Sequence, residues 1–303
     1  MPKAKSELTD WKQRAPLEVP RAGCAVGVVG DNVLVAGGTY WREGQKIWDV
    51  RADLYDPATD RWQPLAPLPQ PRADVAALAA GDAFYIFGGG ADGPAVAAVL
   101  CHQGGAWREL PRMALPAPRR SSAAVLLDGT FYLLGGFAGT GGDYASATTT
   151  LWAATPGSAW RVLAPMPGPA RFLAAVGALG GRLIVAGGCT PEDGKVRNLD
   201  EVLSYDVRND QWSTLGRLPS AFRGACGAVV GDRLLVFGGY ADKFLSQILS
   251  VDPVTGESKV VGELPVGVAD TRFFLVGSDV IGVTGENGIK MRFPDTIVAS
   301  LAE

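Results

Sequence analysis

A glutamate and an arginine stand six residues apart near the C-terminal end of the chain, in the segment VTGENGIKMR. A glutamate in a partly dry site can act as a general acid or base, and an arginine beside it can hold an anionic substrate through paired hydrogen bonds. Glu286 and Arg292 are therefore candidate catalytic residues. The alternative is an ion pair between the two side chains that only stabilises their own loop.

The sequence lacks the residues that several other kinds of catalytic site require. His102 is the only histidine, so any Ser-His-Asp triad would have to use it. A metal site with several imidazole ligands cannot form, and we expect no metal site. We expect His102 itself to be exposed at a turn. No phosphate-binding loop or dinucleotide motif is present, and we expect no cofactor. The four cysteines are widely spaced and are expected to be buried thiols.

The composition of the chain argues against nucleic acids and membranes as binding partners. A formal net charge of −3 and a pI near 5.4 argue against a nucleic-acid-binding surface. No apolar run approaches the 18 or so residues of a membrane span, so we expect no membrane segment. The charged N-terminus shows no secretory signal, which predicts a cytoplasmic protein, with a processed exported form as the open alternative.

Five Gly-Gly doublets divide the chain at intervals of 47 to 52 residues, each at the end of an apolar run such as VLVAGG or FYIFGG. They begin at Gly37, Gly88, Gly135, Gly187 and Gly238. Thr284-Gly285 falls in phase as a sixth doublet in which threonine replaces the first glycine. Tryptophans and Asp-containing turns recur in the same phase, and no segment has helical periodicity. Each repeat therefore predicts four short antiparallel strands.

Six such repeats predict an all-β chain folded as a six-bladed β-propeller. The last repeat supplies only three strands before the chain stops. The segment of residues 8–17 has the tryptophan and proline of a fourth strand. We expect it to form the outer strand of the sixth blade and so close the ring, with residues 1–303 as a single domain.

The doublet that ends the second strand, the tryptophan in the fourth strand and the period near fifty residues resemble kelch repeats. This resemblance covers essentially the whole chain. It implies the propeller fold and says almost nothing about function, because function resides in sites added to folds.

Arginines recur about 16 residues before the doublets, where the loops should lie on the same face as those that follow the doublets. They are Arg21, Arg72, Arg119 and Arg171, with Arg223 and Arg272 near the same phase. As a set, these side chains are expected to surround the mouth of a central channel and attract an anionic ligand. The alternative is that they cap or bridge blades through hydrogen bonds to loop carbonyls.

Aromatic residues outside the repeat pattern are a second group of binding candidates. Trp41 and Trp48 lie in the long loop TYWREGQKIWDVR and are candidates for substrate contacts, with packing over their own blade as the alternative. The loops of residues 137–147 and 189–200 are also long and could form walls of a site. The tryptophans that recur in phase are instead expected to pack between blades.

The segment VTGENGIKMRFPDTIVASL is similar to one blade of the bacterial kelch-type N-acetylneuraminate epimerases, also called sialate mutarotases. There the second strand ends in Gly-Glu, an arginine follows six residues later, and an aspartate opens the next strand. The resemblance implies that Glu286 and Arg292 are catalytic and that Asp295 contributes to the substrate site. It also implies an isomerase that interconverts the anomers of an anionic sugar.

Two further readings stay open on the residues alone. One is a non-catalytic propeller that binds a protein or peptide on the loop face. The other is a sugar-binding protein without turnover. The sequence therefore does not decide whether the protein is an enzyme.

Overall fold

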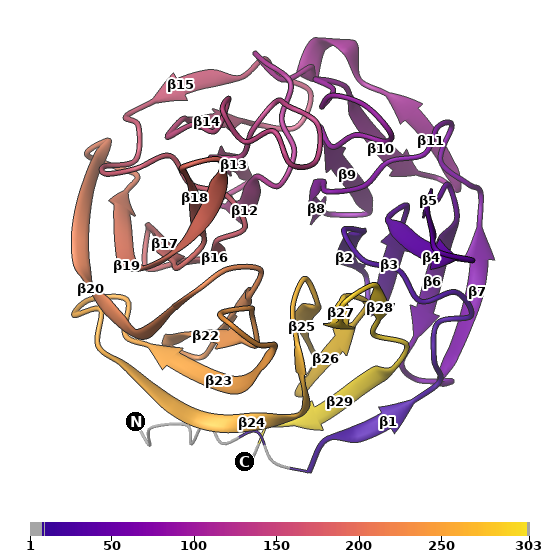
Figure 1. Ribbon diagram of the computed structural model, residues 1–303. Helices are drawn as coiled ribbons and strands as arrows, with labels where there is room; N and C mark the ends of the chain where they lie inside the picture. Colours follow the sequence, from indigo (N-terminus) through magenta and orange to yellow (C-terminus); the bar gives the residue numbers. More distant parts are fainter. Residues whose placement is uncertain (1–7, 9, 302–303) are drawn as a thin grey trace. The chain divides into compact units, whose positions relative to one another are not determined.

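The structure is a computed structural model that describes residue 8 and residues 10–301. Nearly all of its regular elements are antiparallel strands, labelled in Figure 1. The chain divides into two compact units, one formed by Met1–Pro20, Ala174–Gly188 and Asn198–Glu303, the other by Arg21–Leu173 and Cys189–Arg197. That residues 1–303 form a single domain stays a prediction.

The unit that contains Arg21–Leu173 has three four-stranded sheets. They are β2 (Ala25–Val29), β3 (Asn32–Ala36), β6 (Ala52–Asp56) and β7 (Arg61–Leu65); β8 (Ala76–Ala80), β9 (Ala83–Phe87), β10 (Val99–Gln103) and β11 (Ala106–Glu109); and β12 (Ala123–Leu127), β13 (Thr130–Leu134), β14 (Leu151–Ala154) and β15 (Arg161–Leu163). Smaller elements of this unit are the ribbon of β4 (Thr39–Arg42) and β5 (Gln45–Trp48), the 3-10 helix η1 (Pro111–Met113) and β18 (Cys189–Glu192).

The other unit also has three such sheets. They are β16 (Ala175–Leu179), β17 (Arg182–Ala186), β19 (Lys195–Asp206) and β20 (Gln211–Phe222); β21 (Cys226–Val230), β22 (Arg233–Phe237), β23 (Leu245–Val251) and β24 (Ser258–Val268); and β25 (Arg272–Val276), β26 (Asp279–Val283), β29 (Thr296–Ser300) and β1 (Lys12–Arg14). A small ribbon of β27 (Glu286–Gly288) and β28 (Met291–Arg292) leaves the last sheet.

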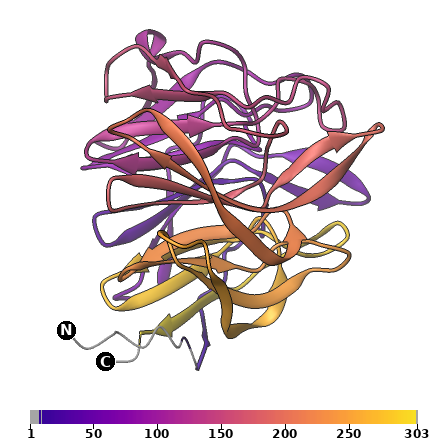
Figure 2. The ribbon, with the colours of Figure 1, turned by 90° about the vertical axis from the view of Figure 1, so that its left-hand side faces the viewer.

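The N-terminal strand completes the last sheet, as predicted. β1 lies beside β29 in the ribbon views (Figures 1 and 2). The two strands pair antiparallel so that Gln13 faces Ile297, and Leu8 forms an isolated bridge with Leu301. Of the predicted segment 8–17, residue 9 lies outside the described residues. Five four-stranded antiparallel sheets, one of them completed from the opposite end of the chain, and a sixth sheet in which β18 joins β16, β17, β19 and β20 as a fifth strand make the fold a six-bladed β-propeller.

The burial of each strand explains the sequence pattern. The second strand of a sheet is covered on both faces, so it reads as a continuous apolar run, as in β9 with all five residues buried. The fourth strand is an edge, and in β7 only Trp62 and Leu65 are even half-buried. Apolar side chains of neighbouring sheets pack against each other, for example Phe237 stacked on Phe273 with 4.5 Å between ring centroids.

Two recurring tryptophans bridge neighbouring repeats, as expected. The indole N–H of Trp107 donates to the Ala66 carbonyl at 2.8 Å, and that of Trp160 donates to the Met113 carbonyl at 2.7 Å. Trp62 and Trp212 contact tyrosines of their own sheets, with ring centroids 5.1 and 5.0 Å apart. These side chains have structural roles in the repeat. Among the described residues no helix is long and apolar enough to cross a bilayer.

Candidate functional site

The altered doublet keeps the backbone conformation of the others. Thr284 has a φ of 61° and Gly285 a φ of 104°, close to the 62° and 110° of Gly238 and Gly239. This left-handed region is rarely adopted by a β-branched residue. Thr284 is also buried, and its hydroxyl has no hydrogen-bond partner among the described residues. A strained residue therefore begins the loop that carries Glu286.

Glu286 directly follows this doublet, and backbone hydrogen bonds to Ala269 fix the position of its main chain. Its N–H donates to the Ala269 carbonyl at 2.8 Å, and its own carbonyl accepts from the Ala269 N–H at 2.9 Å. The Phe293 N–H donates to the Gly285 carbonyl at 2.8 Å, which brings the far end of the loop back to its start. Glu286 and Arg292 are consequently paired across the ribbon of β27 and β28.

The two candidate catalytic side chains are in direct contact. Arg292 Nη1 donates to Glu286 Oε1 at 2.6 Å. The Arg292 side chain is 6% exposed, whereas that of Glu286 is 31% exposed. A neighbouring guanidinium favours the charged form of a carboxylate, which is the form that accepts a proton. The geometry therefore allows Glu286 to act as a base at a partly exposed position, while the ion pair considered as the alternative is also formed.

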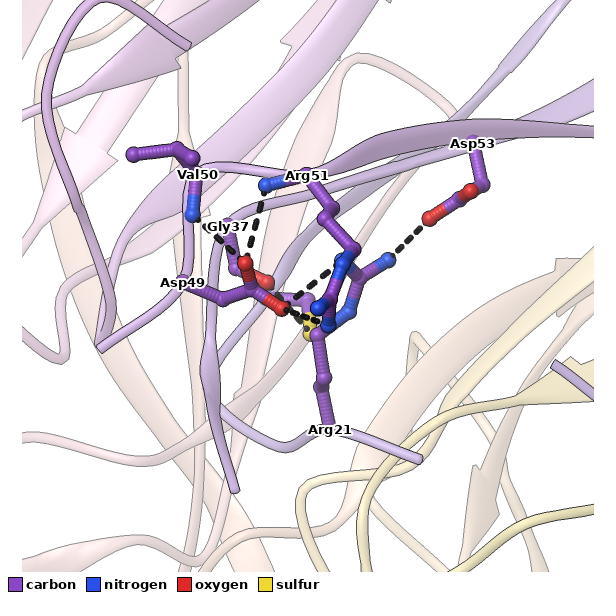
Figure 3. Close-up of polar contacts among 7 residues, drawn as sticks. Arg21, Gly37, Asp49, Val50, Arg51 and Asp53 are labelled. Carbon is purple, nitrogen blue, oxygen red and sulfur yellow. Dashed lines mark hydrogen bonds and ion pairs between the residues drawn. The ribbon is translucent and has the colours of Figure 1, made fainter. Parts of the chain in front are cut away.

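Arg21 precedes β2, and its side chain contacts two carboxylates of the same repeat (Figure 3). Its guanidinium bonds Asp53 and reaches Asp49 Oδ2 at 3.3 Å, and the side chain is fully buried. Arg51 contacts the same Asp49 oxygen at 3.0 Å. Burial alone would lower the pKa of Arg21, but the charged neighbours raise it above its ordinary value. Its present contacts are those of a residue that stabilises its blade.

The next three motif arginines are buried as well. Arg72 is within hydrogen-bonding distance of the Gly88 and Ala98 carbonyls, and burial lowers its pKa. The Arg119 guanidinium lies 4.7 Å from the centre of the Trp152 ring, and burial lowers its pKa too. Arg171 is 1% exposed. Carbonyl contacts of this kind match the bridging alternative, and a role of these side chains in substrate binding stays a prediction.

The last two predicted arginines differ from the rest. Arg223 is half-buried, lies over the Tyr240 ring with 4.7 Å to its centre, and donates to Asn198 Oδ1 at 2.8 Å. Arg272 is not in the loop that precedes its sheet. It is the first residue of β25, paired with Val283, because it stands 12 residues before Thr284 and not 16 residues before, as the first four arginines do before their doublets.

The two loop tryptophans belong to a regular ribbon. Trp41 is paired with Lys46 and Trp48 with Thr39 in β4 and β5, and both indoles are half-buried. The Lys46 ammonium lies 5.5 Å from the centre of the Trp48 ring. The Trp48 indole thus contacts its own ribbon. A role of either tryptophan in substrate binding stays a prediction.

Asp295 points toward the N-terminal strand. Gln13 Nε2 donates to Asp295 Oδ1, across the pairing of β1 with β29. That strand is the edge of its sheet. Asp295 therefore stabilises the closure of the last blade, and its role in substrate binding stays a prediction.

His102 is placed differently from the prediction of an exposed turn residue. It lies in β10, half-buried, with its ring 4.9 Å from that of Trp107, and burial lowers its pKa. The prediction was wrong because the strand continues one residue past His102 before it turns. The four cysteines are buried thiols, as expected. No group of three or more His, Cys, Asp or Glu side chains suited to a metal ion occurs among the described residues.

Sequence reasoning missed three polar residues on these loops. Arg120 is 3% exposed and lies between Asp74 Oδ2, 3.7 Å away, and the Gly93 carbonyl at 2.9 Å. Asn198 and Tyr240 orient Arg223. For Tyr240 a signal was present, because it directly follows its doublet and so occupies the same repeat position as Glu286.

Comparisons with known proteins agree with this architecture. The family model described as Kelch motif matches residues 20–69 and 170–219. The solved structure of YjhT superposes with a TM-score of 0.78 over 93% of this chain and 95% of that chain, at 17% sequence identity. At that identity the likeness concerns the fold alone.

Two curated relatives share a name. The N-acetylneuraminate epimerase of Haemophilus influenzae (strain 86-028NP) is 26% identical over 196 residues, 52% of each chain. That of Yersinia enterocolitica serotype O:8 / biotype 1B is 28% identical over 170 residues, 43% of each chain. The chain thus spans about half the length of the curated relatives it matches. It is a kelch-repeat β-propeller that resembles the N-acetylneuraminate epimerases.

Proposed function

We propose that this protein interconverts the anomers of an anionic sugar of the sialic acid class, with Glu286 as the acid–base residue. The observation that carries the proposal is the contact between Glu286 and Arg292, which places a partly exposed carboxylate beside a buried guanidinium on a loop after the second strand of a blade. The names of the two curated relatives support the choice of sugar class.

The reaction needs only proton transfers. Glu286 accepts the proton of the anomeric hydroxyl, whose oxygen then forms a carbonyl with the anomeric carbon. The bond from that carbon to the ring oxygen breaks, and the ring oxygen takes a proton from a donor on its other side. Rotation of the open chain and reversal of these steps close the ring as the other anomer. No oxidant, metal or cofactor enters the balance.

Proton NMR tests the proposal. A freshly prepared α anomer of N-acetylneuraminate is added to the wild-type protein, and the approach to anomeric equilibrium is followed against buffer. We expect a faster approach with the wild type and a rate near that of buffer with Glu286→Gln, because the amide cannot accept the proton. General acid–base groups contribute about 100- to 10,000-fold, so the loss should be large.

Glu257→Gln is the matched control, since Glu257 is an exposed side chain in the turn before β24 and the substitution makes the same charge change. It should retain the wild-type rate. A wild-type rate equal to that of buffer would overturn the proposal for this substrate, and an unaltered rate in Glu286→Gln would overturn the assigned role.

A binding protein without turnover is the second candidate, and one observation favours it. At the tip of the β27–β28 ribbon the side chains of Ile289 and Met291 are 87% and 59% exposed. Exposed apolar residues on a short loop are typical of a surface that contacts a protein or peptide. This candidate predicts that N-acetylneuraminate exchange is unaccelerated in the wild type and in every variant, whereas the enzyme predicts acceleration by the wild type and by Glu257→Gln and its loss in Glu286→Gln.

A further inference from the structure

The guanidinium of Arg223 is held by neutral groups at a half-buried position. Its backbone pairs with Tyr240, with N–H to carbonyl distances of 3.1 and 2.7 Å in the two directions. The guanidinium carbon lies 4.7 Å from the centre of the Tyr240 ring. Asn198 Oδ1 accepts from Nη1 at 2.8 Å, and the Asn198 amide donates to the Tyr240 carbonyl at 3.1 Å. Stacking and a fixed amide thus orient the group.

The charge of Arg223 is not balanced by an acidic side chain. In the part of the chain that the structure describes, Arg21, Arg120 and Arg292 each contact a carboxylate, and Arg223 contacts none. A guanidinium has five N–H donors, of which Asn198 engages one. A half-buried, oriented guanidinium with donors to spare is suited to bind a carboxylate through two parallel hydrogen bonds.

Arg223 and Glu286 lie on loops of two successive sheets. Arg223 with Tyr240, and Ala269 with Glu286, are the same backbone bridge in two successive sheets of one unit. The Asp270 N–H donates to the Gly224 carbonyl at 2.7 Å, and the Gly239 N–H donates to Val268 at 2.8 Å. These two hydrogen bonds join the bridges side by side on one face of the two sheets.

Arg292 is poorly placed to hold a ligand as well as Glu286. Its side chain is 6% exposed and already bonds Glu286 Oε1. A second carboxylate brought to Glu286 also needs its own cation, because two adjacent carboxylates repel. The ligand's negative charge therefore calls for a guanidinium other than Arg292.

We propose that Arg223, oriented by Asn198 and the ring of Tyr240, binds the carboxylate of the sugar, while Arg292 is a positioning residue that holds Glu286. This inference rests on the proposed function for its choice of ligand. It assigns the specificity for an acid over a neutral sugar to a loop of the fifth blade, one blade before Glu286.

Binding measured by calorimetry tests the assignment without turnover. The probes are N-acetylneuraminate and its methyl ester, which differ by one charge. The wild type should bind the acid about 10- to 100-fold more tightly than the ester, as expected for charge-assisted hydrogen bonds. Arg223→Gln should bind acid and ester alike, at the affinity of the wild type for the ester. Arg208→Gln, an exposed arginine in the turn before β20, is the control and should keep the preference.

Asn198→Asp keeps the size of the side chain and supplies Arg223 with a competing carboxylate. We expect it to weaken binding of the acid and to leave that of the ester within about twofold. This variant, with thermal unfolding of both variants, separates loss of the site from loss of the fold.

The outcomes distinguish the two proposals. If Arg223→Gln still prefers the acid while the wild type turns it over, the role of Arg223 is overturned and the proposed function stands. If Arg223→Gln loses the preference and no turnover is seen, the carboxylate site stands and the enzyme is overturned. If the wild type binds neither probe, both are overturned.

Discussion

Arg292 Nη1 lies 2.6 Å from Glu286 Oε1, across a two-stranded ribbon that begins two residues after a threonine in the left-handed region. This ribbon follows the doublet of the last repeat and carries a carboxylate. One oxygen of that carboxylate is fixed by a largely buried guanidinium. This relationship assigns different tasks to the two residues, and the first prediction follows from it.

Arg292→Gln should reduce the rate of anomer exchange about 10- to 100-fold while N-acetylneuraminate affinity changes by less than about threefold. The reason is that Arg292 orients Glu286 and does not hold the ligand. Exchange NMR gives the rate and calorimetry the affinity. Arg292→Lys keeps the charge and should recover part of the rate. A loss of affinity equal to the loss of rate would contradict the positioning role.

Thr284→Gly should stabilise the protein by about 1 kcal/mol, because glycine adopts the left-handed conformation without strain and removes a buried hydroxyl that lacks a partner. Chemical unfolding of both proteins measures the difference. Gly238→Thr is the matched control at the same repeat position. A Cβ there would lie 2.5 Å from the Val268 carbonyl oxygen, so this variant should be destabilised. Destabilisation by Thr284→Gly would show that the threonine is not strained.

Asp49→Ala should destabilise the protein by about 3 kcal/mol, because it leaves the buried guanidinium of Arg21 with one carboxylate in place of two and removes the acceptor of the Val50 and Arg51 N–H groups. Denaturant titration provides the measurement. Asp200→Ala removes an exposed ion pair with Arg217 and should leave the midpoint nearly unchanged. Equal effects of the two substitutions would refute the structural role of Arg21.

Stability should fall below neutral pH partly through His102. Burial lowers the pKa of His102 below its ordinary value of 6.5, so the unfolded chain binds this proton more tightly than the folded one. The contribution of neutral His102 is complete above pH 6.5 and is lost as the pH falls toward its folded pKa. His102→Gln should therefore lose less stability than the wild type between pH 7.5 and about pH 5.5. Urea midpoints at the two values provide the comparison, and parallel losses would contradict it.

Much of the fold was predictable because the repeat is encoded locally. The doublets need residues that tolerate a positive φ, the second strands need apolar runs that are buried on both faces, and the turns need Asp and Gly. The missing fourth strand of the last repeat pointed to the N-terminus, and β1 paired with β29 confirms it. Each of these signals can be read within one repeat, or from the strand that one repeat lacks.

The candidate site was predictable only in part. The loop with Glu286 and Arg292 stood out because it departs from the repeat, and the structure brings the two side chains together. His102 was placed wrongly, since a shift of one or two residues moves a side chain from a turn into a strand. The shared phase of Arg21 with the other arginines concealed its carboxylate partners, of which Asp53 lies on β6 and Asp49 in the loop before it.

By itself, the amino-acid sequence determined the number of blades, the strands within them and the position of the unusual loop, because strand periodicity and turn chemistry act over a few residues. Only the tertiary structure decided which charges are neutralised. Arg21, Arg292 and Arg223 have the same side chain, but the first has two aspartates, the second a glutamate, and the third an amide and an aromatic ring. The electrostatic state of a guanidinium depends on groups brought together across strands and blades, and that assembly leaves Arg223 as the one of the three whose charge no acidic side chain of the described residues offsets.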